Sequence, residues 1–570
     1  MPSFPAPRTA VPAPPGTAAP GPPGTAGTAA TRAAPHAAWA RLDDEHRYSA
    51  VKAKDARFDG CFFTAVTSTG VYCRPSCPAI TPRRDRVRFF PTSAAAQRAG
   101  FRACKRCRPD ASPGSPEWNL RSDVVGRAMR SIHEGVVDRE GVAGLARKMS
   151  YSPRQLQRLL VAEVGAGPVE LARAQRADTA RILLETTDLR AGDVAFAAGF
   201  GSVRQFNDTI MTVFGDSPSA LRQRAGGRGS TVVRRTGEPV PVVLRLAYRP
   251  PFRADVLFGF LAARLVAGVE EGDATFYRRA LDLPHGSGVV TVRASQDGML
   301  NGTFALEDLR DLTIAVRRVR QMFDLDSEPG AIASVLEADP VLRPAVLALP
   351  GLRVPGHVDG HEVAVRAVLG QQVSVVGARK LASRLALRYG RPLASPAGTV
   401  ERQFPSAETM AGLRPEDLPM PAGRGRALIE LCGLVASGEL SLDAGAHRDE
   451  TSARLLQIPG IGPWTVAHLR MRALGDPDAF PASDLGVRKA LDRLGLPSGE
   501  RHALELSRRW RPYRAYALQY LWSLPIGDDT MSASDRSNGD DCDDNATLGD
   551  QGRVAPDRDP GRADAACRRH

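Results

Sequence analysis

The chain has 570 residues, with 76 Lys and Arg against 63 Asp and Glu and a net charge of +13. This length is several times that of a typical domain, so several cores are expected. No run approaches the roughly 18 apolar residues of a membrane span, and the Pro/Ala-rich amino terminus lacks the apolar segment of a secretion signal. We therefore predict a cytoplasmic protein without a membrane partner, whose cysteines act as metal ligands or nucleophiles rather than in disulfides.

The charge and the small residues are distributed unevenly. Residues 526–570 contain 11 Asp and 6 Arg, so the remainder is more basic than the total suggests. A basic surplus favours a polyanionic partner, most economically nucleic acid. The Pro/Ala/Gly-rich residues 1–41 and the acidic residues 526–570 are predicted to be disordered. The Gly/Arg-rich residues 225–237 are predicted to be a linker.

Between these segments we expect a multidomain protein, mainly α with α+β parts. The patterns predict an α/β cysteine-rich module, an all-α double helix-turn-helix, a small antiparallel α+β domain and an α-helical domain. Their expected ranges, in this order, are 42–112, 118–224, 238–330 and 331–525. Alternation and β-branching predict strands near 242–252, 289–293 and 299–305, and beyond residue 330 the pattern is helical almost throughout.

Four of the eight cysteines form two close pairs, Cys73 with Cys77 and Cys104 with Cys107, joined by 26 residues. Each pair can hold a metal ion from one tight turn, so the spacing predicts a tetrahedral zinc site. A zinc ion that only folds a small module is the simpler interpretation. Cys61 has no partner in either pair and is interpreted as an ordinary thiol.

Residues 58–77 and 99–109 resemble the amino-terminal domain of Ada-type DNA repair proteins. The resemblance implies that Cys73 is both a zinc ligand and the acceptor of a methyl group from a DNA phosphotriester, with Cys77, Cys104 and Cys107 as the other ligands. Methylation would reduce the negative charge of the cluster, so repair should strengthen DNA binding. The candidate phosphate contacts are Arg74, Arg83, Arg84, Arg86, Arg88, Arg102 and Arg106.

Residues 142–160 read as a helix, a short turn and a second helix. Ser152 is a good N-cap and Pro153 suits the first helical position. An inward stripe is formed by Leu156, Leu159 and Leu160. The open side presents residue types that suit base edges and phosphates: Arg154, Gln155, Gln157 and Arg158.

The pattern recurs at 191–207, where Ser202 caps a helix that presents Arg204, Gln205 and Asn207. A plain helical spacer would show the same periodicity. The stretch nevertheless resembles the AraC-type DNA-binding domain in Gly199-Phe200, in Gln205-Phe206 and in residues 214–222. The resemblance implies two recognition helices about one DNA turn apart, promoter DNA as a target, and RNA polymerase as a partner of a monomeric regulator.

Residues 456–470 contain the hairpin Ile-Pro-Gly-Ile-Gly between two helical runs. Gly460 and Gly462 let backbone amides approach a phosphate, and the start of the following helix favours an anion. Asp484 lies 20 positions after Trp464. An isolated hairpin can be a simple clamp, and an isolated Asp at a helix start is usually a cap. Together they are stronger evidence for a catalytic site.

This pairing resembles the helix-hairpin-helix DNA glycosylase superfamily, and most closely the AlkA-type 3-methyladenine DNA glycosylase, over about 243–525. The resemblance implies a catalytic carboxylate at Asp484, pocket aromatics at Trp464 and Trp522, and a wedge near Gln372. Ionised Asp484 would stabilise the developing positive charge of the sugar, and the indoles would stack on electron-poor alkylated bases. Trp464 occupies the position where related lyases place a lysine, so a monofunctional glycosylase is predicted.

Two departures from the AlkA pattern concern the substrate range. Gln372 is polar where an apolar wedge is usual, and His468 and Leu485 stand where tyrosines are expected. The leading hypothesis is a DNA-3-methyladenine glycosylase type II with methylphosphotriester-DNA–cysteine methyltransferase and regulatory activities. The alternative is a methylation-responsive transcriptional regulator whose glycosylase fold only clamps DNA.

Overall fold

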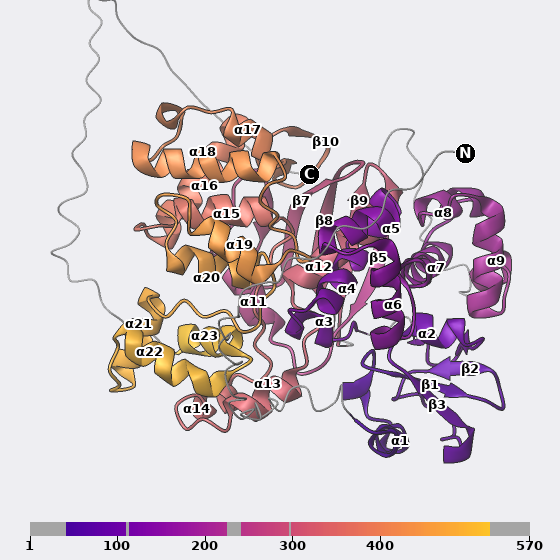
Figure 1. The fold of residues 1–570 in the computed structure, drawn as a ribbon. Helices are drawn as coiled ribbons and strands as arrows, with labels where there is room; N and C mark the ends of the chain where they lie inside the picture. Colours follow the sequence, from indigo (N-terminus) through magenta and orange to yellow (C-terminus); the bar gives the residue numbers. More distant parts are fainter. Residues whose placement is uncertain (1–41, 110–112, 225–240, 296–297, 525–570) are drawn as a thin grey trace, which may run out of the picture. The chain divides into compact units, whose positions relative to one another are not determined.

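The computed structural model describes residues 42–109, 113–224, 241–295 and 298–524 (Figure 1). Within these ranges the chain is mainly helical with three small sheets, in agreement with the predicted fold class. No helix in the described ranges is long and apolar enough to cross a membrane.

Three of the predicted segments lie outside the described residues. These are the two segments predicted to be disordered, 1–41 and 526–570, and the predicted linker, 225–237.

The cysteine-rich module contains a four-stranded mixed sheet. Its strands are β1 (Phe63–Val66), β2 (Val71–Cys73), β3 (Val87–Phe90) and β4 (Arg102–Ala103), in the order β3-β1-β2-β4. Strand β1 is antiparallel to β2 and β3, whereas β2 and β4 are parallel, with Tyr72 opposite Ala103. The module also has two helices, α1 (Asp44–Ala53) and α2 (Ser93–Arg98). Because β2 and β4 run in the same direction, the cysteines that end or follow them meet at one end of the sheet.

The next segment is entirely helical. Its helices are α3 (Glu117–Leu120), α4 (Val124–His133), α5 (Val136–Met149), α6 (Pro153–Val164), α7 (Pro168–Thr186), α8 (Ala191–Ala197), α9 (Val203–Phe214) and α10 (Pro218–Arg224). Gly141, at a φ of 68°, interrupts α5, so its second half begins where the first helix-turn-helix unit was predicted to begin. Ser152 caps α6 and Pro153 is its first residue, as predicted, and Leu156 and Leu160 are fully buried.

A five-stranded antiparallel sheet follows. Its strands are β5 (Val242–Ala247), β6 (Glu270–Gly272), β7 (Phe276–Leu283), β8 (Gly286–Ala294) and β9 (Met299–Leu306), in the order β5-β9-β8-β7-β6. Helices α11 (Ala254–Ala262) and α12 (Leu312–Met322) accompany it. The predicted strands correspond to β5, β8 and β9. The sequence did not single out β6 and β7, because β7 carries two arginines and an aspartate among its apolar residues.

The last part is a helical domain. Its helices are α13 (Pro329–Leu336), α14 (Arg343–Ala348), α15 (Gly360–Leu369), α16 (Val375–Tyr389), α17 (Ala407–Ala411), α18 (Ala422–Ala436), α19 (Arg448–Leu455), α20 (Pro463–Arg472), α21 (Leu485–Arg493), α22 (Glu500–Ser507) and α23 (Arg514–Ser523). The expectation of helix almost throughout missed one hairpin, β10 (Pro392–Ala397) and β11 (Val400–Arg402). Apolar side chains of α15, α16, α18, α19 and α20 form one continuous core.

A buried charge network joins the five-stranded sheet to α15. Arg279 of β7 contacts Glu362 at 2.5 Å and Glu270 at 3.2 Å, and Arg366 contacts both carboxylates at 3.0 Å. The side chains of Arg279 and the two glutamates are at most 3% exposed. Although burial alone would raise it, Arg279 and its positive neighbours hold the pKa of Glu362 well below its usual value. The network therefore depends on every member being present.

We expect the substitution Arg279→Met to lower the free energy of unfolding by about 3 kcal/mol or more, because it removes a positive charge that pairs with two buried carboxylates. The shift of the denaturation midpoint by circular dichroism measures this effect. Arg310→Met is the control, because it removes an exposed pair with Asp308 and should leave the midpoint nearly unchanged. Equal shifts in the two variants would contradict the interpretation.

Candidate functional site

Four cysteines converge at one end of the four-stranded sheet. The Sγ atoms of Cys73, Cys77, Cys104 and Cys107 all lie within 4.8 Å of one another. The amide of Cys104 donates to the carbonyl of Tyr72 at 2.9 Å, so the parallel pairing of β2 and β4 brings the two pairs together. The 26-residue connection in the sequence contains β3, α2 and β4.

The clustered thiols change one another's acidity. Contacts with Cys107, Cys73 and Cys77 lower the pKa of Cys104 far below its usual value, whereas contacts with Cys104, Cys107 and Cys77 raise that of Cys73. Four sulfurs this close share protons unless a cation compensates their charge. Sulfur is a preferred ligand of Zn²⁺, and four sulfurs complete a tetrahedral site. The donor set therefore fits one Zn²⁺.

The turn between Cys73 and Cys77 is held by Asp59. Its Oδ1 accepts from the amide of Ser76 at 3.0 Å and its Oδ2 from the Ser76 hydroxyl at 2.5 Å. Arg74 forms an ion pair with the same carboxylate at 3.3 Å. Burial raises the pKa of Asp59, and these contacts oppose the rise. Arg74, one of the arginines predicted to contact phosphate, therefore already forms an ion pair within the protein.

Cys61 and Cys432 lie outside this cluster. Burial raises the pKa of Cys61 to about 11 and that of Cys432 to about 12, so both remain protonated thiols at neutral pH. A second group of possible ligands, Glu270, His357 and Glu362, belongs to the buried charge network, where Arg279 and Arg366 neutralise its carboxylates.

The two predicted recognition helices are α6 and α9. Arg154 and Arg158 are exposed on α6, and Arg204 and Asn207 are exposed on α9.

Gln155 has an additional role that the sequence reading did not give it. Its Oε1 accepts from the amide and the hydroxyl of Ser152 at 3.1 and 2.8 Å, which forms a capping box. Gln205 similarly accepts from the amide of Gly201 at 3.3 Å. Gln155 therefore keeps only its NH₂ group for contacts beyond the helix, because both lone pairs of its oxygen are used, whereas the oxygen of Gln205 can accept one more hydrogen bond.

Asp484 is the point where three helices meet. As the N-cap of α21, its Oδ1 accepts from the amides of Gly486 at 2.8 Å and Val487 at 3.2 Å. The same oxygen accepts from Nε1 of Trp522 on α23 at 2.9 Å, and Oδ2 accepts from Nε1 of Trp464 on α20 at 2.8 Å. The structure thus brings together the three residues predicted to form the excision site. All four partners are N–H donors, which match the acceptor-only oxygens of a carboxylate.

Gly486 is a site residue that the sequence reading missed. A Cβ at this position would lie 2.7 Å from Cδ1 and Nε1 of Trp522 and 2.9 Å from Oδ1 of Asp484. Only glycine therefore lets the indole reach the carboxylate. A glycine in the first turn of a helix, two positions after a capping Asp, is the signal that could have identified it.

The two departures from the expected tyrosines occupy different places. His468 stacks on Trp464, with ring centroids 5.3 Å apart and planes 16° apart, whereas Leu485 is 61% exposed. Burial lowers the pKa of His468 to about 3, and the charges of Arg472 and Arg264 contribute. The imidazole is therefore neutral at physiological pH and extends the aromatic wall beside Asp484.

The hairpin before α20 has the predicted glycines. Gly460 adopts a φ of 93°, which favours glycine, and Gly462 is the N-cap of α20. Nε2 of Gln371 donates to the carbonyl of Gly460 and to the hydroxyl of Thr465, both at 3.1 Å. The residue after it, Gln372, is exposed and has a φ of 58°. The predicted wedge is therefore tied to the hairpin and to the helix of Trp464.

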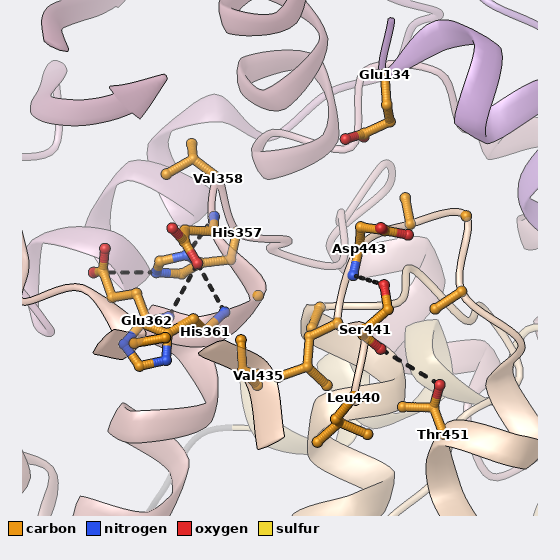
Figure 2. A pocket seen from close by; sticks show the side chains of 18 of the residues that line it. Glu134, His357, Val358, His361, Glu362, Val435, Leu440, Ser441, Asp443 and Thr451 are labelled. Carbon is orange, nitrogen blue, oxygen red and sulfur yellow. Dashed lines mark hydrogen bonds and ion pairs between the residues drawn. The ribbon is translucent and has the colours of Figure 1, made fainter. Parts of the chain in front are cut away.

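A cavity of about 700 Å³ lies elsewhere, and its lining does not include Asp484, Trp464 or Trp522. Figure 2 shows part of its wall, where His357 contacts Glu362 and the Thr451 hydroxyl donates to the carbonyl of Ser441. The residues predicted to carry out the chemistry thus lie at the meeting point of α20, α21 and α23 and not in the lining of this cavity.

Three family models match the chain. The metal binding domain of Ada matches residues 46–110, a helix-turn-helix domain matches residues 145–224, and the AlkA N-terminal domain matches residues 243–359. The fold and the sites define a class of protein in which a zinc-binding cysteine module and a helix-turn-helix domain precede a glycosylase-type helix-hairpin-helix region.

Similar proteins identify the family more narrowly. A probable bifunctional transcriptional activator/DNA repair enzyme AlkA of Mycobacterium tuberculosis is 53% identical over 481 residues, covering 84% of this chain and 96% of that protein. The chain belongs to this family of bifunctional AlkA proteins. The DNA-3-methyladenine glycosylase 2 of Escherichia coli is 32% identical over 49% of this chain and 95% of that enzyme. The Escherichia coli enzyme Ada is 38% identical over 24% of this chain and 37% of its own length.

We expect the purified protein to contain one zinc ion per chain, held by the four-cysteine cluster. Replacing Cys104 by Ser should reduce the zinc content to near zero, because a hydroxyl is a poor substitute for a thiolate ligand. Elemental analysis of protein purified without chelators measures this. Cys61→Ser, outside the cluster, is the matched control and should retain the metal. Full zinc content in the Cys104 variant would contradict the ligand assignment.

Proposed function

We propose that this chain is a DNA alkylation repair protein in which Asp484 directs hydrolysis of the N-glycosidic bond of alkylated bases such as 3-methyladenine. The observation that carries the proposal is the convergence of two indole N–H groups and a helix start on one carboxylate. A structural N-cap needs only the two amides of α21. The tryptophans add donors and aromatic surface at the same point, and these are the groups that excision requires.

The geometry suits a hydrolytic reaction. Oδ1 of Asp484 accepts three hydrogen bonds, whereas Oδ2 accepts one, so Oδ2 keeps a lone pair for water or for the sugar. The bond between C1′ and the base nitrogen breaks, and the base leaves with the electron pair. The carboxylate stabilises the positive charge that develops on the sugar. Water then forms the new bond to C1′ and releases its proton to Asp484 or to solvent.

Recognition of the flipped base would come from aromatic surface. Trp464 and Trp522 offer faces on which electron-poor or cationic bases stack. Such bases are good leaving groups and need little protonation. Lys380 and Lys489 are exposed, and neither is among the four donors to the carboxylate of Asp484, which supports a monofunctional glycosylase over a Schiff-base lyase.

We further propose that Cys73 accepts a methyl group from DNA phosphotriesters. When bound, Zn²⁺ keeps the acceptor as a thiolate. The Cys73 sulfur forms the new bond to the methyl carbon, the bond from that carbon to the phosphate oxygen breaks, and the phosphodiester recovers its negative charge. The cluster of four thiolates loses one negative charge in the process, and repair would therefore strengthen DNA binding.

Each part of the chain has a role in the proposed function. Residues 42–112 would accept methyl groups, 118–224 would read DNA through α6 and α9, and 238–330 with 331–525 would excise bases. DNA, both alkylated and at promoters, is the partner that the helix-turn-helix and glycosylase regions share. Interaction with RNA polymerase, a monomeric state and cytoplasmic action are proposed with it. The rival, a regulator that only clamps DNA, would need neither the paired tryptophans nor the exposed lone pair of Asp484.

Asp484→Asn should abolish release of 3-methyladenine from methylated duplex DNA, because the amide cannot stabilise the cationic sugar and cannot accept on its nitrogen. Chromatography of the released bases measures this, with DNA binding measured in parallel. Asp492→Asn, an exposed position on the same helix, is the matched control and should retain activity. Absence of release by the wild-type protein would favour the clamp.

Cys73→Ala should abolish transfer of labelled methyl groups from methylated DNA to the protein, because the acceptor sulfur is gone. Cys61→Ala serves as a control thiol and should retain full uptake. Mass spectrometry of peptides locates the methyl group. Labelling of Cys104 or Cys107 in the Cys73 variant would refute the acceptor assignment.

A further inference from the structure

The loop between α15 and α16 carries the predicted wedge, Gln372. Its neighbour Gln371 donates to the carbonyl of Gly460 and to the hydroxyl of Thr465 at 3.1 Å. Thr465 follows Trp464, whose indole contacts Asp484. The position of the loop is therefore set by the same hairpin and helix that position the excision site.

Gln372 itself has an unusual conformation. Its φ of 58° lies in the left-handed region that non-glycine residues rarely adopt, and its side chain is exposed. Exposed apolar residues follow it, with Val373 at 39%, Val375 at 46% and Val376 at 51% exposure. Strain of this kind persists where the surroundings over-determine it, and it often marks a functional site. The loop thus presents the polar side chain of Gln372 beside exposed valines.

Arg424 of α18 determines which way the amide of Gln372 points. Its Nη2 contacts the Gln372 side chain at 3.2 Å. A guanidinium group only donates hydrogen bonds, so its partner must be the amide oxygen. The assignment of oxygen and nitrogen in this side chain is therefore chemically determined, and the NH₂ group is left to donate outward.

We propose that Gln372, oriented by Arg424, reads the base opposite the flipped nucleotide and favours cytosine. This inference rests on the proposed function and on the predicted wedge role of Gln372, whose side chain would fill the gap that a flipped base leaves. Gln372 contacts the DNA and determines specificity, whereas Arg424 is a positioning residue.

The preference follows from the pattern of donors and acceptors. An NH₂ group directed at the vacated pairing edge requires acceptors there. Cytosine presents two adjacent acceptors, N3 and O2. Thymine presents two acceptors separated by a donor, and adenine presents one acceptor next to a donor. Guanine presents two adjacent donors. Cytosine pairs with guanine, so the loop would favour lesions of alkylated guanine in their normal pairing.

The experiment measures binding rather than excision. The full-length protein is titrated with duplexes that carry a tetrahydrofuran abasic analogue opposite each of the four bases. We expect the wild type to bind the cytosine duplex about threefold to tenfold more tightly than the guanine duplex. This ratio of affinities corresponds to the net contribution of one hydrogen bond. Gln372→Leu should abolish this preference. Gln372→Glu, which only accepts, should reverse it toward guanine.

Arg424→Met tests the positioning role. It should reduce the preference for cytosine while affinity for undamaged duplex stays within twofold, because the amide becomes free to rotate. Arg426→Met, on the exposed side of the same helix, is the matched control for the loss of one positive charge and should keep the preference. Thermal unfolding of each variant confirms folding.

Equal affinities of the wild type for all four duplexes would overturn the inference, as would a preference that survives Gln372→Leu. Retention of the full preference in Arg424→Met would overturn the role of Arg424. Failure of the proposed function is separate, since it would appear as absence of base release in the excision assay while the binding preferences remained measurable.

Discussion

The carboxylate of Asp484 is the group on which the proposed excision site depends. It accepts an indole N–H from α20, another from α23, and two amides from the start of α21. Hydrogen bonds weaken steeply with distance and angle, so three helices must meet at one point to satisfy it. Gly486 is the accompanying constraint, because any side chain there would displace Trp522.

Two features outside the site support that meeting point. Gln371 ties the wedge loop to the hairpin and to α20, so the element that would enter DNA and the helix of Trp464 share anchors. The ion network of Arg279, Glu362 and their partners joins α15, which precedes this loop, to the five-stranded sheet. Buried charges tolerate little misalignment, because each unpaired member carries a large desolvation cost. The network therefore gives the helical domain a defined attachment.

The cysteine cluster and the proposed excision site stabilise negative charge in different ways. Four thiolates need a cation to coexist, and the charge of their cluster falls when one of them is methylated. Asp484 accepts only from neutral N–H donors and would stabilise positive charge that forms only during the reaction. Residues 42–112 hold 14 basic and 7 acidic side chains, enough to offset a negative cluster. Both centres thus remain compatible with a polyanionic partner.

The sequence by itself determined the features that depend on local chemistry. Four features could be predicted because each depends on residues that are close in the sequence. They are the cysteine spacing, the helix start at Ser152 and Pro153, the strands β5, β8 and β9, and the hairpin with the Trp and Asp that follow it. The tertiary structure decided what depends on distant contacts. Strand β7 was missed because its arginine is paired 83 positions away, at Glu362. The need for Gly486, the capping role of Gln155 and the amide direction of Gln372 appeared only when their partners were in place.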